Sequence, residues 1–278
     1  MSINWYPGHM VKARREIEEN IKLVDIAVIL LDARTPFSCR NQDLEKIARN
    51  TKMIFVLNKR DLAYPAMTRR YAASLKKQGY LVAAMDSTNG KGAGEVLELI
   101  NQAYQERAEA MKVKGRRVRA ARVMVMGVPN IGKSTFLNCL VGKKMARTGA
   151  KPGITRGKQW IRVREDIEFL DTPGLMWPKI SVEEQGLKLA LLSIVGEKSY
   201  SEYDVSLYLI RLLKEKSPQT LKDKFKLDDL DQADEEILNR IARGRGHLLK
   251  GGNLDLDKTC TSLIQDFRKG NLGRISLD

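Results

Sequence analysis

The spacing of apolar and polar residues divides the chain into two parts. In the first two-thirds, short apolar runs alternate with longer segments in which apolar residues recur every three to four positions. The short runs are typical of buried strands, and the longer pattern is typical of helices that cover a sheet. Strands are predicted at 26–31, 53–57, 81–85, 122–126, 159–163 and 167–170. Helices are predicted at 10–23, 41–49, 65–78, 93–109 and 133–141. This alternation indicates an α/β fold with a doubly wound, mostly parallel sheet.

The pattern changes after Pro178, where the strand signals stop. Helical periodicity continues at 182–195, 204–214, 234–243 and 256–268. Acidic residues mark the predicted helix starts and glycines mark the stops: Asp204, Asp231 and Asp255, then Gly196, Gly244 and Gly270. A chain of 278 residues suits two domains of ordinary size. We therefore expect an α/β domain at 1–178 and an all-α domain at 179–278.

A phosphate-binding loop follows the predicted strand at 122–126. The residues at 127–134 read Gly-Val-Pro-Asn-Ile-Gly-Lys-Ser and match G-x-x-x-x-G-K-S in its required place between a strand and a helix. Lys133 is expected to reach the β- and γ-phosphates, and the Ser134 hydroxyl to ligate Mg²⁺. The expected nucleotide contacts of this segment are Asn130, Ile131, Gly132, Lys133, Ser134 and Thr135.

Two further segments are predicted to sense the metal and the terminal phosphate. Asp171, in Asp-Thr-Pro-Gly at 171–174, follows a strand and is expected to hold Mg²⁺, while the Gly174 N–H faces the γ-phosphate. Thr155 lies in a Gly- and Pro-containing segment at 152–157 and can cap Mg²⁺ when GTP is bound. The alternative for Thr155 is an incidental residue of a loop.

The purine-reading motif is Asn-Lys-Arg-Asp at 58–61, after the strand at 53–57. Asp61 can accept hydrogen bonds from guanine N1–H and N2–H₂, a donor pair that adenine does not present, so ATP should be rejected. Asn58 can serve the other edge of the base, and the Lys59 stem can cover its face. Asp86 and Ser87 follow the next strand, in the place of the last base-contacting loop.

The order of these motifs is rotated. An ordinary small GTPase has the phosphate loop first and the purine-reading motif last, whereas here the purine-reading motif comes first. The ends of an unrotated chain would meet at the basic stretch 112–122, which is either a solvated linker or a phosphate-binding arm. Its cations are Lys112, Lys114, Arg116, Arg117, Arg119 and Arg122.

The charge balance points to a polyanionic partner. The chain carries 49 Lys and Arg against 34 Asp and Glu, a formal net charge of +15. Nucleic acid is favoured over a membrane because no amphipathic anchor accompanies the charge. The longest apolar run is too short to span a bilayer, no signal segment is recognisable, and the three cysteines are scattered. We expect a cytoplasmic protein with no membrane partner.

The order and wording of the motifs resemble the circularly permuted P-loop GTPases, most closely the ribosome biogenesis GTPase A family. Trp-Tyr-Pro-Gly-His-Met at 5–10 and Asp-Ala-Arg-Thr-Pro at 32–36 extend this resemblance. It implies a factor that binds GTP and GDP, binds the immature large ribosomal subunit and hydrolyses GTP late in assembly. The C-terminal domain is then implied to contact rRNA, and a monomer is expected when free. A tRNA- or small-subunit-directed GTPase, or an RNA-binding scaffold that uses nucleotide only for stability, are the alternatives.

The residues after Gly174 do not identify the side chain that orients the attacking water. Many GTPases place a glutamine there to orient water, but this chain has Leu-Met-Trp at 175–177, which predicts slow turnover by the protein alone. Asn130 resembles the asparagine of GTPases that recruit K⁺, or else merely shapes the loop. The family resemblance marks His9 as the water-positioning residue, whereas a lone histidine is more often a packing or capping residue. The predicted catalytic group is thus His9, Asn130, Lys133, Thr155 and Gly174.

Overall fold

The computed structural model describes residues 3–4, 8–142, 160–170, 174–177, 179–180 and 182–278. The chain divides into two compact units. The α/β unit comprises Asn4–Lys179 together with Asp278, and the helical unit comprises Met1–Ile3 together with Ile180–Leu277. Each unit is described by itself.

A six-stranded sheet forms the centre of the α/β unit. Its strands are β2 (Ile26–Asp32), β3 (Lys52–Asn58), β4 (Leu81–Ala84), β5 (Ala121–Met126), β6 (Trp160–Arg164) and β7 (Ile167–Leu170). They lie in the order β4-β3-β2-β5-β7-β6, and every neighbouring pair is parallel except β6 and β7. The short strands β1 (Ile3–Asn4) and β8 (Lys179–Ile180) form a separate two-stranded sheet. The predicted mostly parallel sheet is confirmed.

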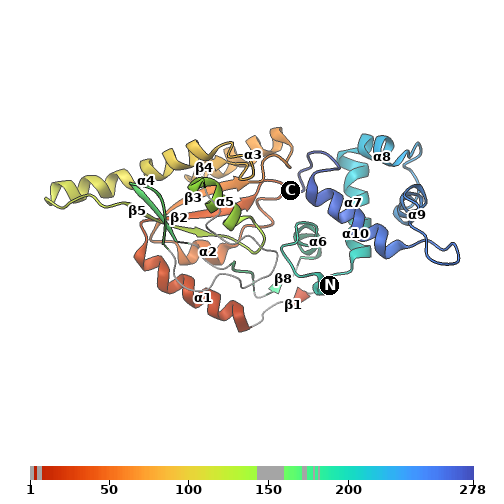
Figure 1. Cartoon of the computed structure of the whole chain (residues 1–278), viewed down its shortest axis with the longest axis horizontal. Helices are drawn as coiled ribbons and strands as arrows, with labels where there is room; N and C mark the ends of the chain where they lie inside the picture. The colour runs from red at the N-terminus through yellow and green to blue at the C-terminus, as the bar shows by residue number, and fades with distance from the viewer. Residues whose placement is uncertain (1–2, 5–7, 143–159, 171–173, 178, 181) are drawn as a thin grey trace. The chain divides into compact units, whose positions relative to one another are not determined.

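Helices cover both faces of this sheet (Figure 1). They are α1 (Gly8–Asn20) with the 3₁₀ turn η1 (Ile21–Leu23), α2 (Gln42–Ile47), α3 (Pro65–Lys77), α4 (Ala93–Val113) and α5 (Lys133–Val141). Leu170 of β7 packs in one core cluster with Ile17 of α1 and Leu44 of α2. The preceding residue, Phe169, meets Phe136 of α5 with ring centroids 6.2 Å apart. Successive strand residues point to opposite faces, so α1 and α2 cover one face and α5 the other.

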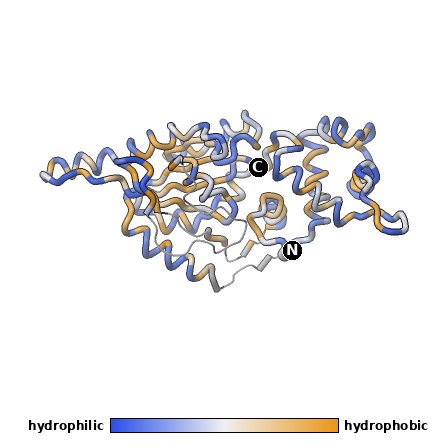
Figure 2. Tube along the Cα trace, viewed as in Figure 1, coloured by the Kyte–Doolittle hydropathy of each residue, from blue (hydrophilic) through white to orange (hydrophobic). Residues whose placement is uncertain are grey.

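The strand register brings the carboxyl ends of the parallel strands to one edge. Asp32 at the end of β2 lies beside Asn58 at the end of β3, and Ile29 lies beside Met126, the last residue of β5. All seven residues of β2 are buried, and the strands are coloured mainly as hydrophobic in Figure 2. The segments that follow β3, β4 and β5 therefore emerge together, as expected for a ligand site of a parallel sheet.

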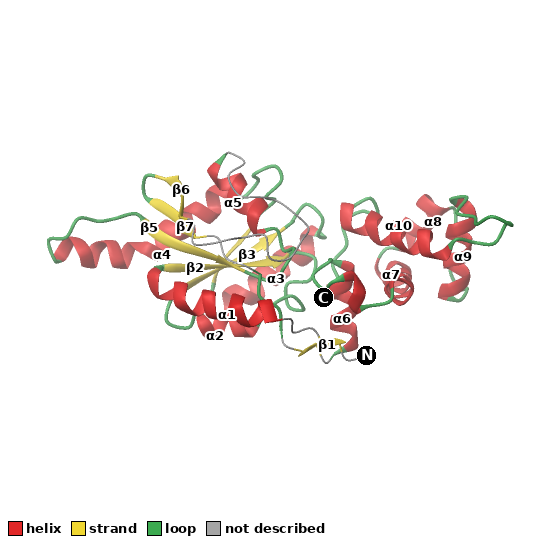
Figure 3. Cartoon of the chain, turned by 60° about the horizontal axis from the view of Figure 1, so that its bottom comes forward, coloured by secondary structure: helices red, strands yellow, loops and turns green. Residues whose placement is uncertain are grey.

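Helix α4 is longer than its apolar pattern predicts. The pattern ends at 109, but the helix continues to Val113. Its buried residues are Val96, Leu97, Ile100 and Tyr104, all in the first half. The second half extends past the sheet in two different views (Figures 1 and 3).

The helical unit contains five α-helices among its described residues. They are α6 (Glu183–Leu191), α7 (Glu202–Lys216), α8 (Pro218–Phe225), α9 (Asp234–Gly244) and α10 (Leu256–Lys269), with a 3₁₀ turn η2 (Glu197–Ser199). The pattern did not predict α8, whereas α9 begins at Asp234 as predicted, three residues after the acidic residue Asp231. Asp255 caps α10 by accepting from the Lys258 N–H, and Gly270 ends that helix at φ +77°. No described helix has the combination of length and apolar character that crossing a bilayer requires.

Candidate GTP-binding site

The phosphate loop at 127–134 connects β5 to α5 at the carboxyl edge of the sheet. Gly132 precedes α5 at φ +98°, and a Cβ there would lie 2.7 Å from Asn58 Nδ2. Only glycine satisfies both the conformation and the close approach. Lys133 Nζ donates to the carbonyls of Gly127 and Val128 at 3.3 and 3.1 Å, so the ammonium lies along the loop. A cation beside a glycine-rich loop and a helix N-terminus suits phosphate groups.

Asn58 connects three segments of the site. Its Nδ2 donates to the Ile131 carbonyl at 3.1 Å, and its Oδ1 accepts from Ser87 Oγ at 2.7 Å. The residue is only 1% exposed. Both ends of the amide therefore hold the purine-reading motif against the phosphate loop and the loop after β4. A direct contact of Asn58 with the base stays a prediction.

Lys59 makes a second connection between the purine-reading motif and the phosphate loop. Its Nζ donates to the Asn130 carbonyl at 3.0 Å and lies 3.2 Å from Asp32 Oδ2. Both Lys59 and Asn130 adopt left-handed backbone conformations, with φ +58° and +56°. Burial lowers the pKa of Lys59, and the Asp32 carboxylate opposes that effect. The lysine thus fixes the backbone of the residue that the sequence proposes for K⁺.

Asp32 and Arg34 belong to the site, although the sequence motifs predicted no role for them. Arg34 donates from Nε and Nη2 to the two Asp32 carboxylate oxygens at 2.9 and 2.8 Å. Burial alone would raise the pKa of Asp32, but Arg34 and Lys59 outweigh it and hold that pKa well below the ordinary value. The sequence did offer one indication of this role, because Asp32 is an acidic residue that directly follows a predicted buried strand. The pair forms the anchor for Lys59.

Asp61 and Asp86 lie near the loop after β4 in different settings. Asp86 Oδ1 accepts from the backbone N–H groups of Thr88 and Asn89 at 2.8 and 3.3 Å, so its side chain shapes that loop. Asp61 is partly exposed, and burial together with the nearby charge of Asp86 raises its pKa. The predicted contact of Asp61 with guanine stays a prediction.

Gly174 packs directly on the phosphate loop. A Cβ at this position would lie 2.7 Å from the backbone nitrogen of Pro129 and 3.0 Å from Lys133 Nζ. The next residue, Leu175, donates its N–H to the Gly127 carbonyl at 3.2 Å. Leu175 and Met176 are 2% and 1% exposed. Their side chains are therefore buried and apolar, and they cannot orient an attacking water.

Several predicted site residues lie beyond what the structure describes. Thr155 and Asp171 fall outside the described residues, and His9 is the second residue of α1 but its side chain is not described. Ser134 and Thr135 are the second and third residues of α5. Across the described residues no three His, Cys, Asp or Glu side chains gather as metal ligands. A hydroxyl such as Ser134 is nevertheless a fitting Mg²⁺ donor, because Mg²⁺ keeps several waters and uses few protein ligands beside phosphates.

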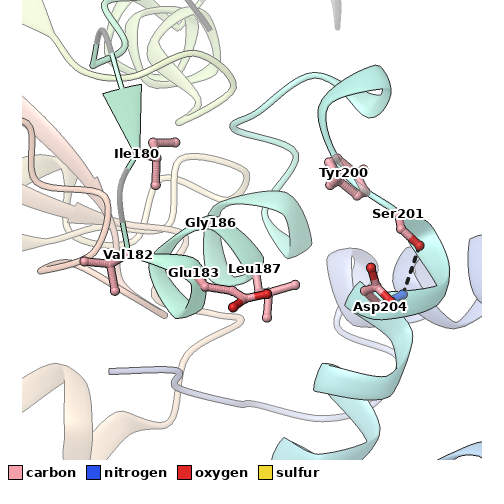
Figure 4. Close-up of a pocket in the computed structure, with 8 residues that line it drawn as sticks. All are labelled: Ile180, Val182, Glu183, Gly186, Leu187, Tyr200, Ser201 and Asp204. Atoms are coloured by element: carbon pink, nitrogen blue, oxygen red, sulfur yellow. Dashed lines mark hydrogen bonds between the residues drawn. The ribbon is translucent and has the colours of Figure 1, made fainter. Parts of the chain in front are cut away.

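The helical unit contains a small pocket beside α6 and α7 (Figure 4). Its lining includes Ile180, Leu187 and Tyr200, and the Asp204 N–H donates to Ser201 Oγ at its rim at 3.2 Å. The cavity volume is about 50 Å³. That volume holds a water or two and excludes a nucleotide.

Comparison with known proteins agrees with the geometry of the α/β unit. Residues 122–246 match the family model described as "50S ribosome-binding GTPase". The chain is 40% identical over its full length to ribosome biogenesis GTPase A of Bacillus pumilus, covering 99% of that protein. The Thermotoga maritima relative with the same name is 31% identical over 99% of the chain and 94% of that protein. The crystal structure of GNP-bound YlqF from T. maritima matches with a TM-score of 0.64 at 26% identity, covering 96% of this chain and 97% of that one. The chain is thus a GTPase and belongs to the ribosome biogenesis GTPase A family.

Proposed function

We propose that this GTPase is an assembly factor that binds the immature large ribosomal subunit and acts late in its maturation. The observation that carries the proposal is the cross-connection of the purine-reading and phosphate loops through Asn58 and Lys59. It supports a site for a guanine nucleotide with phosphates, in a chain whose relatives are named for ribosome biogenesis. The choice of the large subunit is supported by the matching family description, which names the 50S subunit.

The helical unit offers a basic groove for rRNA. The groove has a volume of about 670 Å³ and lies between α8 and α9. Its cations are Lys224, Lys226, Arg240, Arg243 and Arg245. Arg243 and Arg245 form ion pairs with Glu236 and Asp266, whereas no described acidic side chain pairs with the other three. Unpaired cations in a groove suit the phosphates of a nucleic acid.

GTP turnover by the isolated protein is proposed to be slow and to be stimulated by the subunit. Burial of Leu175 and Met176 supports this, because no side chain there substitutes for the usual glutamine. His9 is proposed to position the attacking water on the ribosome, and K⁺ near Asn130 to supply positive charge. Mg²⁺ would be held by Ser134, Thr155 and Asp171 with the phosphates, where it neutralises charge during transfer.

Subunit dependence is the direct test of the proposed function. GTP turnover is measured with purified large subunits, with small subunits and with neither, at equal protein concentration. Stimulation by large subunits, by about 10³-fold or more if the missing group is completed there, is expected. Stimulation by small subunits alone, or turnover independent of both, would contradict the proposal.

The two catalytic proposals are separated by two further measurements. His9→Ala should retain GTP affinity and lose subunit-stimulated turnover, since a water-positioning side chain does not bind the nucleotide. Turnover in K⁺ should exceed turnover in Na⁺ at the same ionic strength. Unchanged turnover in the variant removes His9 from the mechanism, and equal rates in the two salts remove the ion.

A further inference from the structure

The segment that joins α4 to β5 makes a detour that the fold does not require. Tyr104 of α4 donates its hydroxyl to the Arg119 carbonyl at 3.0 Å, so these two residues are already neighbours. Connections between such elements commonly need two to about six residues. Here the chain instead continues outward along α4 to Val113, turns, and returns to Arg119. The detour lies beyond the sheet edge and adds no residue to the buried core.

The detour is nevertheless a defined structure. The helical part after Tyr104 is nine residues long, about 13 Å at the rise of an α-helix. Gly115, at φ +65°, ends it: the Gly115 N–H donates to the Lys112 carbonyl and the Arg116 N–H to the Met111 carbonyl, both at 2.9 Å. This pair of hydrogen bonds is the Schellman arrangement of a capped helix end. The chain therefore presents its turn at a fixed place.

The base of the detour is clamped by a buried carboxylate. Asp25, which precedes β2, accepts two hydrogen bonds from Arg119 at 2.7 and 2.9 Å and one from the Arg122 N–H at 2.9 Å. Arg107 of α4 contacts the same carboxylate at 2.8 Å. Both the outgoing and the returning limb are thus held at one point. The Arg119 guanidinium is thus paired within the fold, and the Arg122 side chain lies 4.0 Å from Glu168 and over the Trp160 ring.

The far end of the detour carries the remaining cations. We define the basic tip as Lys112, Lys114, Arg116 and Arg117, all of which are exposed. Lys112 pairs with Glu109 at 2.8 Å, but no described acidic side chain pairs with the other three. Three cations within four positions repel one another, and no described carboxylate offsets this repulsion. Such an arrangement becomes favourable when a polyanion approaches.

We propose that the basic tip is an RNA-backbone contact of the α/β unit, separate from the groove of the helical unit. This inference rests on the proposed ribosomal function and adds a second attachment point to it. Phosphates are favoured over an acidic protein surface because Val113 is the one exposed large apolar residue between Lys112 and Arg117, which is too little for the apolar and aromatic core of a protein interface. Val113 is exposed nearby, but one apolar residue makes no membrane anchor.

The location of the tip fits such a contact. β5 runs from Ala121, at the clamped base, to Met126, which leads directly into the phosphate loop. The nucleotide site therefore lies at one end of the strand and the tip beyond the other. RNA held at the tip leaves the nucleotide edge open for exchange and hydrolysis.

The test compares two triple variants of the full-length protein. The tip variant combines Lys114→Ala, Arg116→Ala and Arg117→Ala. The control combines Arg69→Ala, Lys76→Ala and Lys77→Ala, which removes the same charge from exposed positions of α3. Dissociation constants for purified large subunits and for an RNA duplex of arbitrary sequence are measured over a series of KCl concentrations, together with GTP turnover without subunits.

The tip variant should bind both probes more weakly, on the order of 10- to 100-fold near 0.1 M salt, with the salt slope reduced by about one unit per lost contact. Its turnover without subunits should equal that of the wild type. Equal slopes for the two variants, beside normal wild-type binding, would overturn the tip contact and leave the proposed function intact. Weaker subunit binding with unchanged duplex binding would also overturn it and identify a protein partner. Failure of the wild type to bind subunits would remove the proposed function itself.

Discussion

Strand β2 has a buried aspartate at each end, and the two carboxylates use the same chemistry for different purposes. Asp25 precedes the strand and Asp32 ends it. Each accepts a bidentate arginine, Arg119 in one case and Arg34 in the other. Each also contacts a second cation, which is Arg107 or Lys59. Asp25 holds together the base of the detour that carries the basic tip, and Asp32 holds together residues of the nucleotide site.

The exposure of the partners distinguishes the two ends. The Arg34 side chain is 3% exposed and that of Lys59 25%, whereas those of Arg119 and Arg107 are 35% and 55% exposed. Cations that reach water can be solvated when their carboxylate is lost, but a buried one cannot. Loss of the carboxylate should therefore destabilise the protein more at Asp32, beside the nucleotide site, than at Asp25, at the base of the detour.

The largest expected difference concerns stability. Asp32→Asn leaves the Arg34 charge buried without its counter-ion and should lower the free energy of unfolding by about 3–5 kcal/mol. Asp25→Asn should lower it by about 1–2 kcal/mol, because its partners gain water. Unfolding in urea is followed by tryptophan fluorescence, since Trp160 and Trp177 both belong to the α/β unit. Equal losses of unfolding free energy in the two variants would contradict the expected difference between Asp25 and Asp32.

The next effect concerns nucleotide choice at the carboxyl end. Asp61→Asn should weaken GTP binding by about 10- to 150-fold, the equivalent of 1.5–3 kcal/mol for hydrogen bonds to a charged acceptor. Binding of xanthosine triphosphate should improve, because the asparagine amide complements the xanthine edge. Titration with both nucleotides measures the change, and Asp25→Asn is the control that should keep the wild-type preference. Retained GTP selectivity in Asp61→Asn would refute its assigned role.

Gly174, beside the phosphate loop, and Gly115, at the basic tip, test how tightly the chain is packed at these two places. Gly174→Ala would force a methyl group against Pro129 and should cost about 1–3 kcal/mol, seen as weaker GTP binding. Gly115→Ala meets no atom within 4 Å and should cost only about 1 kcal/mol of stability through its left-handed backbone. GTP titration and urea unfolding of both variants are the measurements. Weaker GTP binding in Gly115→Ala would show that the ends are coupled.

The smallest expected effect is a pH dependence. The pKa of Asp61 is raised by burial and by Asp86, and only the ionised carboxylate accepts both guanine hydrogen bonds. GTP affinity should therefore be full near neutral pH and decline as the pH falls toward the raised pKa, a few-fold before an ordinary aspartate would protonate. The dissociation constant is measured from pH 7.5 to 5. The same decline in Asp61→Asn would assign the titration to another group.

The sequence predicted the elements whose signals are local. The strands, the phosphate loop and the place of the purine-reading motif follow from apolar runs and from motif letters that adjoin them. The pairing of Arg119 with Asp25 joins residues 94 positions apart and has no local signal. The end of α4 was predicted four residues early, at 109, because its last buried residue is Tyr104 and the helix beyond it covers no core. Helix-forming residues such as Ala108 and Ala110 continue it to Val113, and Gly115 then ends it. Helix α8 was missed because its eight residues bury only Leu221.

The hydrogen bonds by which Asn58 and Lys59 connect the purine-reading motif to the phosphate loop have a thermodynamic consequence. Because the two loops share hydrogen bonds at 3.1 and 3.0 Å, ordering one of them also restricts the other. A ligand that occupies only the purine side then lowers the entropic cost of binding on the phosphate side, and the reverse holds to the same degree. Guanosine and pyrophosphate should bind cooperatively as separate molecules. The intact nucleotide would then gain affinity from the protein's own linkage as well as from the covalent bond between its halves.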